Sequence, residues 1–368
     1  MKPKSDMANP EKTVGIKDIA HALKISLGTV DRALHDRPGV SPKTRELVLK
    51  TAQQFGYSPN LAAQALKLNR RLSVAVVLPK HISHFFDPLR EGIRSAAAGA
   101  VGVNLSLESF EYPRLGSGDI EAFRRATQKQ FDGVIFLPGD ARKYESLVKK
   151  ATQDGIATMC VGSDAPNTER IGSVSVHASV SGAIAAELLS QNLTSKAEVA
   201  IFTGELSTLD HVEKLRGFAA ALAVIAPHLT LRPALESHER PREAYRQALE
   251  VMKGNARPSG IYISTANSMP VLKALEELGL LGKVKVVTTD LFHELVPLIE
   301  TGKVLATLYQ RPFTQGKVAL ENLLIHLLRD RKPQPTLQLA PHVIFRTNLC
   351  LFENRIGTSE DEDIETEL

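Results

Sequence analysis

Residues 15–34 read GIKDIAHALKISLGTVDRAL, a stretch in which a short helical pattern ends, breaks and begins again. Apolar residues recur along it at the i, i+3, i+4 and i+7 spacing of one helix face, with a single interruption: Ile16, Ile19, Ala20, Leu23, Val30 and Leu34. Ser26, just before the second group, can cap a helix N-terminus. The stretch predicts two short helices joined by a tight turn, with four residues forming a small core: Ile19, Ala20, Val30 and Leu34.

The sequence that follows residue 34 predicts a third helix. Ser41 and Pro42 form a helix-start signal, and an apolar pattern then runs to Gly56, a residue type common at helix ends. The segment 60–68 begins with Asn60, another capping residue, and several small side chains follow it. A helix in this segment would bury little surface of its own, so we expect it to be too short to persist alone.

The positive charge of the chain is concentrated at its N-terminal end. Residues 1–71 contain 13 Lys and Arg against 6 Asp and Glu, a difference of +7, whereas the remainder contains 32 against 35, a difference of −3. A basic module in which a second short helix follows a tight turn favours insertion of that helix into a DNA major groove. Pattern and charge alone also fit a small helical bundle with a solvated charged face.

From residue 72 onward the sequence alternates apolar strands with amphipathic helices. We predict eight strands: 73–79, 103–110, 133–138, 156–162, 198–204, 260–265, 283–290 and 304–310. Continuous apolar strands separated by helices indicate parallel sheets that are covered on both faces. The predicted fold class is α/β, with two doubly wound lobes behind an all-α N-terminal domain. Ligands of such sheets bind beyond the carboxyl ends of the strands.

The composition disfavours several classes of protein. No apolar stretch approaches the ~20 residues of a membrane span, and the start MKPKSDMANPEKT has no apolar export segment, so we expect a soluble, cytoplasmic protein. Motifs of zinc peptidases, serine hydrolases and phosphate-binding loops are absent from the sequence, so we expect no catalytic residue, cofactor or metal. Cys160 and Cys350 each lie in an apolar run typical of a buried thiol.

The segment 15–70, GIKDIAHALKISLGTVDRALHDRPGVSPKTRELVLKTAQQFGYSPNLAAQALKLNR, resembles the DNA-binding headpiece and hinge of the lac repressor (LacI/GalR) family of bacterial transcription regulators. The resemblance implies a flexible N-terminus over 1–12, a helix-turn-helix headpiece over 13–58, and a hinge helix with linker over 59–71. It also implies a set of DNA-binding residues: Leu27, Gly28, Thr29, Arg32, Ser41, Lys43, Thr44, Asn60, Ala63 and Leu66.

The residue types in the headpiece fit that chemistry. The guanidinium of Arg32 can take O6 and N7 of one guanine together, which is worth ~1 to 3 kcal/mol of discrimination. The hydroxyls of Thr29, Ser41 and Thr44 can donate to phosphates, and Lys43 adds sequence-independent attraction. We therefore expect Arg32 to carry most of the base recognition.

The resemblance also assigns a role to the hinge. In the family, paired hinge helices enter the minor groove and a leucine wedges between base pairs. By the match this leucine is Leu66, with Ala63 beside it, although Leu66 could also pack as an ordinary helix residue.

Two residues of the headpiece depart from the family pattern. Gly28 stands where relatives often carry a base-reading side chain, and Asp31 stands where Ser is usual. Asp31 could accept from a cytosine amino group or orient Arg32.

Residues 72–350 resemble the periplasmic sugar-binding fold that the family carries behind its headpiece, and the stretches are more similar to ribose-binding proteins than to the lac repressor core. The resemblance and the strand ends together predict an effector-binding set: Phe85, Phe86, Asp140, His177, Lys214, Asn267, Asp290 and Gln310.

Three residues of this set have an alternative role in packing or capping. Phe85 and Phe86, in SHFFDPLREGI, would stack on a sugar face, or else pack in the core. Asp140 and Asp290 each follow a strand and suit bidentate acceptance from vicinal hydroxyls, and Asp290 matches a family motif directly. A helix-capping role is the alternative for Asp290.

Two members of the set depart from the family in charge. Lys214 stands where Arg is usual, and His177 stands where Asp or Asn is usual. Because Lys is a point donor and not a fork, these changes allow a different ligand pattern, such as an acidic or phosphorylated one. Arg216 or His211 could instead take the donor role of Lys214.

The predicted function is that of a sequence-specific transcription regulator, a repressor, with a small carbohydrate-like effector bound between two lobes. We expect a homodimer on a near-palindromic double-stranded DNA operator, because one recognition helix reads only a few base pairs. Induction and corepression both remain open, and an activator is a lesser alternative. A cytoplasmic sugar-binding or sugar-modifying protein with a vestigial headpiece is the alternative of another class. The acidic tail, 351–368, contains no leucine heptads, so we expect dimers.

Overall fold

The computed structural model describes residues 15–34, 37–55, 71–194, 196–254, 257–329, 331, 333–352 and 356. The chain forms two compact units, Met1–Gln64 and Ala65–Leu368. Three groups of predictions lie outside the described residues: the flexible N-terminus over 1–12, the hinge residues Asn60, Ala63 and Leu66, and most of the acidic tail.

The N-terminal unit contains three short helices within its described residues: α1 (Ile16–Leu23), α2 (Leu27–Leu34) and α3 (Pro42–Gln54). Their apolar faces pack on one another around Ile19 and Val30, which are fully buried, and Leu34 packs at the edge. Lys24 takes a left-handed conformation and ends α1, so the chain turns at once into α2. The helix-turn-helix pattern and the four predicted core residues are confirmed.

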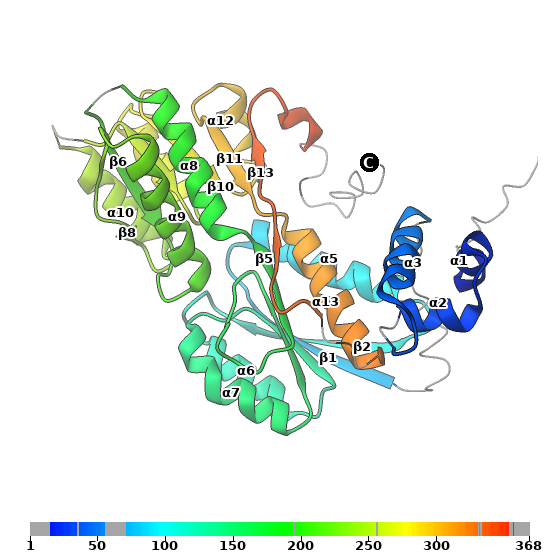
Figure 1. Ribbon diagram of the computed structural model, residues 1–368. Coiled ribbons are helices and arrows are strands. Elements are labelled where there is room, and N and C mark those ends of the chain that lie inside the picture. Colours follow the sequence, from blue (N-terminus) through cyan, green and yellow to red (C-terminus); the bar gives the residue numbers. More distant parts are fainter. Residues whose placement is uncertain are drawn as a thin grey trace, which may run out of the picture. The chain divides into compact units, whose positions relative to one another are not determined.

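The first sheet of the C-terminal unit has six parallel strands in the order β12-β5-β4-β3-β1-β2 (Figure 1). Its strands are β1 (Arg71–Pro79), β2 (Asn104–Tyr112), β3 (Gly133–Phe136), β4 (Ala157–Val161), β5 (Gly172–Val176) and β12 (Leu337–Leu339). Four helices contact or cover it: α5 (Ser83–Gly99), α6 (Asp119–Gln128), α7 (Ala141–Gln153) and α13 (Pro312–Arg329). This sheet and these helices form lobe 1.

The second sheet has the order β13-β11-β10-β9-β6-β7, with β8 also paired to β6; all its pairs are parallel except β13 with β11. Its strands are β6 (Glu198–Thr203), β7 (Thr230–Leu231), β8 (Leu235–Glu236), β9 (Gly260–Ile263), β10 (Lys285–Thr289), β11 (Ala306–Tyr309) and β13 (His342–Ile344). Its helices are α8 (Ala178–Asn192), α9 (Leu209–Ile225), α10 (Pro241–Met252), α11 (Met269–Glu277), α12 (Val296–Glu300) and the 3₁₀ turn η1 (Leu349–Leu351). Apolar clusters lie on both faces of this sheet, which is lobe 2.

Each lobe contains one pair of helices that pack backbone against backbone. In lobe 1, a Cβ atom added to Gly92 would lie 1.9 Å from the carbonyl oxygen of Phe313 on α13. In lobe 2, a Cβ atom added to Gly182 would lie 2.0 Å from the carbonyl oxygen of Lys214 on α9. Glycine is required at both positions because any side chain would force these helices apart.

The chain passes between the lobes three times. It leaves lobe 1 after β5, at His177, returns after β11, at Gln310 and Arg311, and leaves again between β12 and β13. The backbone N–H of His177 donates to the carbonyl of Leu339 at 2.9 Å, so two of these connections are tied together. This arrangement is suited to a hinge between two rigid bodies.

All eight predicted strands are present, and the predicted α/β fold class is confirmed. Cys160 is buried as expected, but the prediction for Cys350 was wrong, because that side chain is exposed. Cys350 lies in η1, a tight turn that points Leu349 into the core and its neighbour outward. None of the described helices is long and apolar enough to cross a bilayer.

Candidate functional site

The second helix of the N-terminal unit presents a guanidinium on its N-terminal face. The side chain of Arg32 folds back along α2, so that a Cβ atom added to Gly28 would lie 3.7 Å from Arg32 Nη1. It also lies against Gly39, where an added Cβ would be 3.9 Å from Arg32 Cδ. Arg32 Nε has no hydrogen-bond partner among the described residues. The absence of a side chain at Gly28 therefore leaves room for the guanidinium of Arg32 itself.

Helices α2 and α3 begin with the same capping arrangement. Ser26 Oγ accepts from the backbone N–H of Thr29 at 3.1 Å, and the two hydroxyl oxygens lie 2.8 Å apart. Ser41 and Thr44 repeat it at the start of α3, at 3.1 and 2.8 Å. Three of the predicted phosphate donors, Thr29, Ser41 and Thr44, thus also fix the helix ends at which anions bind.

The other predicted residues of this unit lie on its surface. Leu27 is 48% exposed at the start of α2, and Lys43 is exposed in the first turn of α3. Asp31 forms an ion pair with Arg37 Nη1 at 3.0 Å, and Arg45 Nη2 donates to the carbonyl of Arg37 at 2.9 Å. The unusual carboxylate at position 31 is therefore held by the loop between α2 and α3.

A small cavity lies between lobes 1 and 2, and we call it the inner cavity. Lobe 1 lines it mostly with apolar side chains, lobe 2 lines it mostly with polar ones, and Gln310 lines it from a crossing between the lobes. The full lining is Ile82, Phe85, Phe86, Leu115, Leu137, Gly162, Ser163, Thr208, Asp210, His211, Glu239, Thr265, Ala266 and Gln310. Its volume is about 40 Å³, which suits a water molecule but not a sugar, so the lobes must part to admit a larger ligand.

The lobes meet directly around this cavity. His84 Nε2, on α5 of lobe 1, donates to the carbonyl of Ala266 in lobe 2 at 2.8 Å. Ser163 Oγ accepts from the backbone N–H of Asp210 at 3.4 Å. The structure is therefore that of a closed form.

Three predicted residues from separate parts of lobe 2 and its crossing form one buried network. Lys214 Nζ donates to Asp210 Oδ2 at 2.7 Å and to Gln310 Oε1 at 2.6 Å. Gln310 in turn donates to Asp290 through its backbone N–H, at 2.9 Å, and through Nε2, at 2.6 Å. Lys214 and Asp290 are each 1% exposed, so they position Gln310 and Asp210 from behind the cavity wall.

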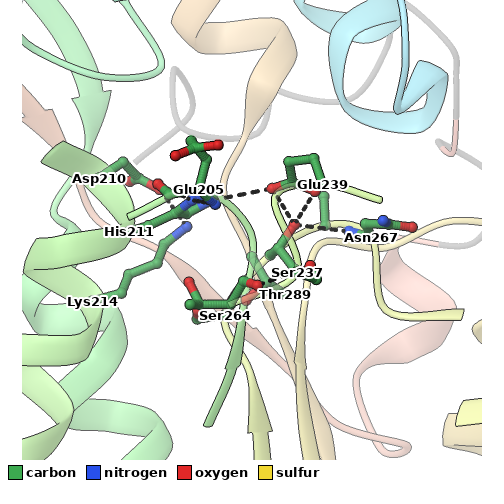
Figure 2. Close-up of polar contacts among 12 residues, drawn as sticks. Glu205, Asp210, His211, Lys214, Ser237, Glu239, Ser264, Asn267 and Thr289 are labelled. Atoms are coloured by element: carbon green, nitrogen blue, oxygen red, sulfur yellow. Dashed lines mark hydrogen bonds and ion pairs between the residues drawn. The ribbon is translucent and has the colours of Figure 1, made fainter. Parts of the chain in front are cut away.

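Two carboxylates at this wall are buried. Burial raises the pKa of Asp290 to about 6, against the opposing effects of Lys214 and of the hydrogen bonds from Gln310. Burial also raises the pKa of Glu239, whose oxygens accept from Thr265 Oγ1 at 2.8 and 3.0 Å. Figure 2 shows His211 pointing toward Glu239, and the distance from His211 Nε2 to Glu239 Oε1 is 3.6 Å. Lobe 2 thus holds protonatable groups beside the inner cavity.

The remaining predicted residues have different environments. Phe85 and Phe86 both line the inner cavity and are nearly buried, with ring centroids 4.9 Å apart. Each ring therefore packs in lobe 1 and also faces the cavity. Asn267 lies at the mouth of the cleft, and His177 lies at a crossing between the lobes. Asp140 caps α7 by accepting from the backbone N–H of Arg142 at 3.2 Å and does not line the inner cavity.

Between the two alternative donors, the structure places only one at the cavity. His211 lines it, whereas Arg216 is 68% exposed and pairs with Glu213 on the surface of α9. Three further residues line the cavity but were not predicted from the sequence: Asp210, Thr208 and Glu239. The spacing of Asp210 and Lys214, one helical turn apart, was the available signal, whereas Glu239 has none.

Two of these missed residues leave buried oxygen atoms without hydrogen-bond partners in the described part of the chain: Thr208 Oγ1 and Asp210 Oδ1. Unpaired buried polar atoms cost free energy, and here both belong to residues that line the inner cavity. The geometry offers one hydroxyl and one carboxylate oxygen to a ligand that carries hydroxyl groups.

One group in the described chain has the spacing of metal ligands. The carboxylates of Glu205 and Glu236 and the imidazole of His238 have ligand atoms within 4.8 Å of one another. His238 Nδ1 lies 3.5 Å from each carboxylate, and the backbone N–H of Leu206 donates to Glu236 at 2.6 Å. These residues satisfy one another, and we assign no metal to them.

Comparison with known proteins bears on both units. The family model described as "Bacterial regulatory proteins, lacI family" matches residues 15–60, and the model described as "Periplasmic binding protein domain" matches residues 74–330. Catabolite control protein A of Priestia megaterium is 23% identical over 269 residues, which cover 73% of this chain and 79% of the relative. The HTH-type transcriptional repressor PurR of Aliivibrio fischeri is 23% identical over 345 residues, which cover 91% and 98%.

Solved structures show the fold of the larger unit. A solute-binding protein from Burkholderia graminis in complex with D-arabinose superposes with a TM-score of 0.69 at 23% identity, covering 76% of this chain and 96% of that one. The glucose-galactose binding protein GanP from Geobacillus stearothermophilus gives a TM-score of 0.69 at 20% identity, with 76% and 99% coverage. The chain belongs to the periplasmic binding protein domain family through residues 74–330, and its N-terminal unit is a helix-turn-helix domain of the lacI type.

Proposed function

We propose that this chain is a transcriptional repressor that recognises its operator through Arg32. The observation that carries the base-reading role is the position of the guanidinium, which lies over Gly28 at the N-terminal end of α2. Leu27 and Thr29 flank it on the same turn. The capped starts of α2 and α3, with Lys43 beside the second, supply phosphate contacts that fix the register.

The proposal includes a homodimer on a near-palindromic operator. One α2 helix of eight residues reaches only a few base pairs, and joining two headpieces multiplies affinity and discrimination. In the same proposal, the hinge residues Asn60, Ala63 and Leu66 contact the centre of the operator. The proposed place of action is the cytoplasm.

The effector of the proposed repressor is a polyhydroxylated compound bound between the lobes. Asp210 Oδ1 would accept from a ligand hydroxyl and Thr208 Oγ1 would donate to or accept from another, which satisfies two buried oxygens at once. Phe85 and Phe86 offer an apolar wall for the C–H face of a sugar ring. The D-arabinose complex of a protein with this fold supports the class of ligand.

Effector and operator are coupled in this proposal through lobe closure. A ligand that contacts both walls stabilises the closed form, and the three crossings limit the motion to a hinge. Lobe 1 begins at Arg71, where the predicted hinge segment ends. Closure of the lobes therefore changes the separation of the two hinge segments in a dimer. We propose a binding role and no catalytic one for the cavity residues.

The DNA-binding part is tested with a duplex selected from random sequence by the purified protein. Arg32→Ala should weaken binding to the selected duplex by roughly five- to 150-fold, equivalent to the ~1 to 3 kcal/mol of a bidentate contact, while binding to random DNA changes little. Lys50→Ala, which removes an exposed cation from α3, is the matched control and should lower both affinities together. Failure to select any preferred duplex would favour a sugar-binding protein with a vestigial headpiece.

A further inference from the structure

A second and much larger cavity opens at the rim of the cleft, and we call it the mouth cavity. It has a volume of about 1010 Å³ and takes its lining from both lobes, including Arg114 from lobe 1 and Arg240, Arg242 and Arg246 from lobe 2. Glu239 lines both the mouth cavity and the inner cavity. A single ligand that enters when the lobes part can therefore reach both cavities.

The charges around the mouth cavity do not balance. Arg240 pairs with Glu243 at 3.6 Å and Arg246 pairs with Glu250 at 4.0 Å. Within the described chain, Arg114 and Arg242 have no carboxylate partner. Two guanidinium groups thus face this space with uncompensated charge.

The acidic residue that remains on the lining offsets only part of this charge. Glu239 is 5% exposed and its carboxylate accepts from Thr265 Oγ1 at 2.8 Å, so one buried carboxylate stands against two arginines without a carboxylate partner in the described chain. His84, on the opposite side, adds no positive charge, because burial lowers its pKa and its Nε2 donates to the carbonyl of Ala266. The net charge of the lining is therefore set by the arginines.

The backbone adds to this positive potential. Helix α10 begins at Pro241, in the lining itself, and among the described residues no side chain caps it. Twelve residues of α10 direct their N-terminal dipole toward the cavity that Arg242 also faces. Glu243 lies in the first turn of α10, but it is paired with Arg240. Guanidinium groups beside a helix N-terminus that no described side chain caps are the combination that binds phosphate and carboxylate groups.

Arg114 makes this site dependent on lobe closure. Its Nε donates across the cleft to the carbonyl of His238 at 3.3 Å, and neither Nη group has a partner among the described residues, so both can reach a ligand. Opening the lobes would carry Arg114 away from Arg242. An anion held by both residues therefore stabilises the closed form by more than its contact with either lobe alone.

We propose that the mouth cavity is an anion subsite, in which Arg114, Arg242 and the start of α10 bind a phosphate or carboxylate group of the effector. This inference rests on the proposed function, since it assigns a charged group to the effector of the inner cavity. The effector class becomes a sugar phosphate or a sugar acid, with its hydroxyl-bearing part at Thr208 and Asp210.

The anion subsite can be tested with simple inorganic anions in place of the effector. Thermal unfolding of the full chain is followed with sodium pyrophosphate or sodium sulfate, against sodium chloride at matched ionic strength. The proposal expects a rise in Tm that saturates with anion concentration, is lost in the double variant Arg114→Gln/Arg242→Gln, and is retained in Arg216→Gln, the exposed control on α9. No anion-specific rise, or an equal rise in the double variant, overturns the proposal. Circular dichroism at low temperature verifies that each variant is folded.

A second experiment distinguishes a phosphate group from a carboxylate group. It also tests the anion subsite separately from the proposed polyhydroxylated effector. Hexose 6-phosphates and pentose 5-phosphates, aldonates and the parent neutral sugars are compared by titration calorimetry. Binding of a charged compound at least tenfold tighter than its neutral parent, with the ratio falling toward one in the double variant, supports the subsite, and the better class identifies phosphate or carboxylate. Neutral sugars that bind as tightly as their charged forms overturn the subsite but leave the proposed polyhydroxylated effector standing.

Discussion

The two walls of the inner cavity differ in kind. Lobe 1 contributes mostly apolar side chains, among them Phe85, Phe86, Leu115 and Leu137, whereas lobe 2 contributes hydroxyl, carboxylate and imidazole groups. The apolar wall is an extension of the core, because both phenylalanines are nearly buried. The polar wall is an ordered network, in which Lys214 and Asp290 hold the groups that face the ligand.

This difference divides the work of recognition between the lobes. The polar wall is oriented before a ligand arrives, so it sets which hydroxyl pattern is accepted. The apolar wall has no directional groups and gains free energy mainly when closure removes water from it. A change in lobe 1 should therefore cost stability and closure, and a change in lobe 2 should cost selectivity.

The largest expected effect tests the apolar wall. Phe85→Ala should reduce the free energy of unfolding by about 3 to 5 kcal/mol, because a nearly buried aromatic ring is removed from lobe 1. Urea unfolding followed by circular dichroism measures it. Phe131→Ala, a half-buried ring of the same lobe outside the cavity, should cost less and leave ligand-induced stabilisation intact. A cost below about 1 kcal/mol for Phe85→Ala would show that this ring belongs to the ligand site alone.

The next effect tests the network behind the polar wall. Asp290→Ala should cost about 2 to 4 kcal/mol, since it leaves the two buried Gln310 donors without acceptors, although Lys214 keeps its ion pair with Asp210. Asp290 also has a positive φ of 64°, which alanine tolerates poorly. Asp290→Asn is the matched control, because asparagine accepts that conformation and keeps one carbonyl oxygen. Equal losses in the two variants would contradict the role of the carboxylate.

A smaller effect follows from the pKa of Asp290, which is raised to about 6 from an ordinary value of 3.8. The folded protein keeps the proton in a range of pH where the unfolded chain has released it, so the free energy of unfolding falls as pH rises from about 4 to 6. Between pH 5 and pH 7 this group should lower stability by about 1 kcal/mol. Urea titrations at both pH values should show that the difference is reduced in Asp290→Asn. A difference of the same size in both proteins would assign the pH dependence to other groups.

The variant with the smallest expected effect on stability gives the most direct test of ligand binding. Thr208→Val removes a buried hydroxyl that has no partner among the described residues, so stability should change by less than about 1 kcal/mol in either direction. The Tm increase produced by a bound polyhydroxylated effector should nevertheless decrease, because one ligand hydroxyl loses its partner. Differential scanning fluorimetry with and without the effector measures both. An unchanged increase would place Thr208 outside the binding set.

Eight strands could be predicted because their apolar residues form a clear run or an alternating pattern, but five others could not. The strand Gly172–Val176 contains two serines and lacks that signal, although all five of its residues are buried. The strands β7, β8, β12 and β13 have two or three residues each and depend on pairing with longer neighbours. Their stability is tertiary, so a local pattern does not reveal them.

The candidate site was predictable where a residue follows a strand, as with Asp290 and Gln310. Position alone did not separate Asp290 from Asp140, which also follows a strand but accepts from Arg142 in its own helix. Glu239 was not predictable, because it reaches the cavity from a loop in which it and His238 both have positive φ. Such a backbone path is set by the surrounding fold and carries no periodic pattern.

The return of α13 and β12 to lobe 1 has a consequence for biosynthesis. The sheet that begins at Arg71 is finished by Leu337–Leu339, and α5 packs on a helix that starts at Pro312. During translation, lobe 1 must therefore wait after β5 while residues 177–311, which contain nearly all of lobe 2, are made before its last helix and strand emerge. We expect the nascent chain to expose the unfilled face of lobe 1 for most of that time, which makes it a client for chaperones that bind apolar surface.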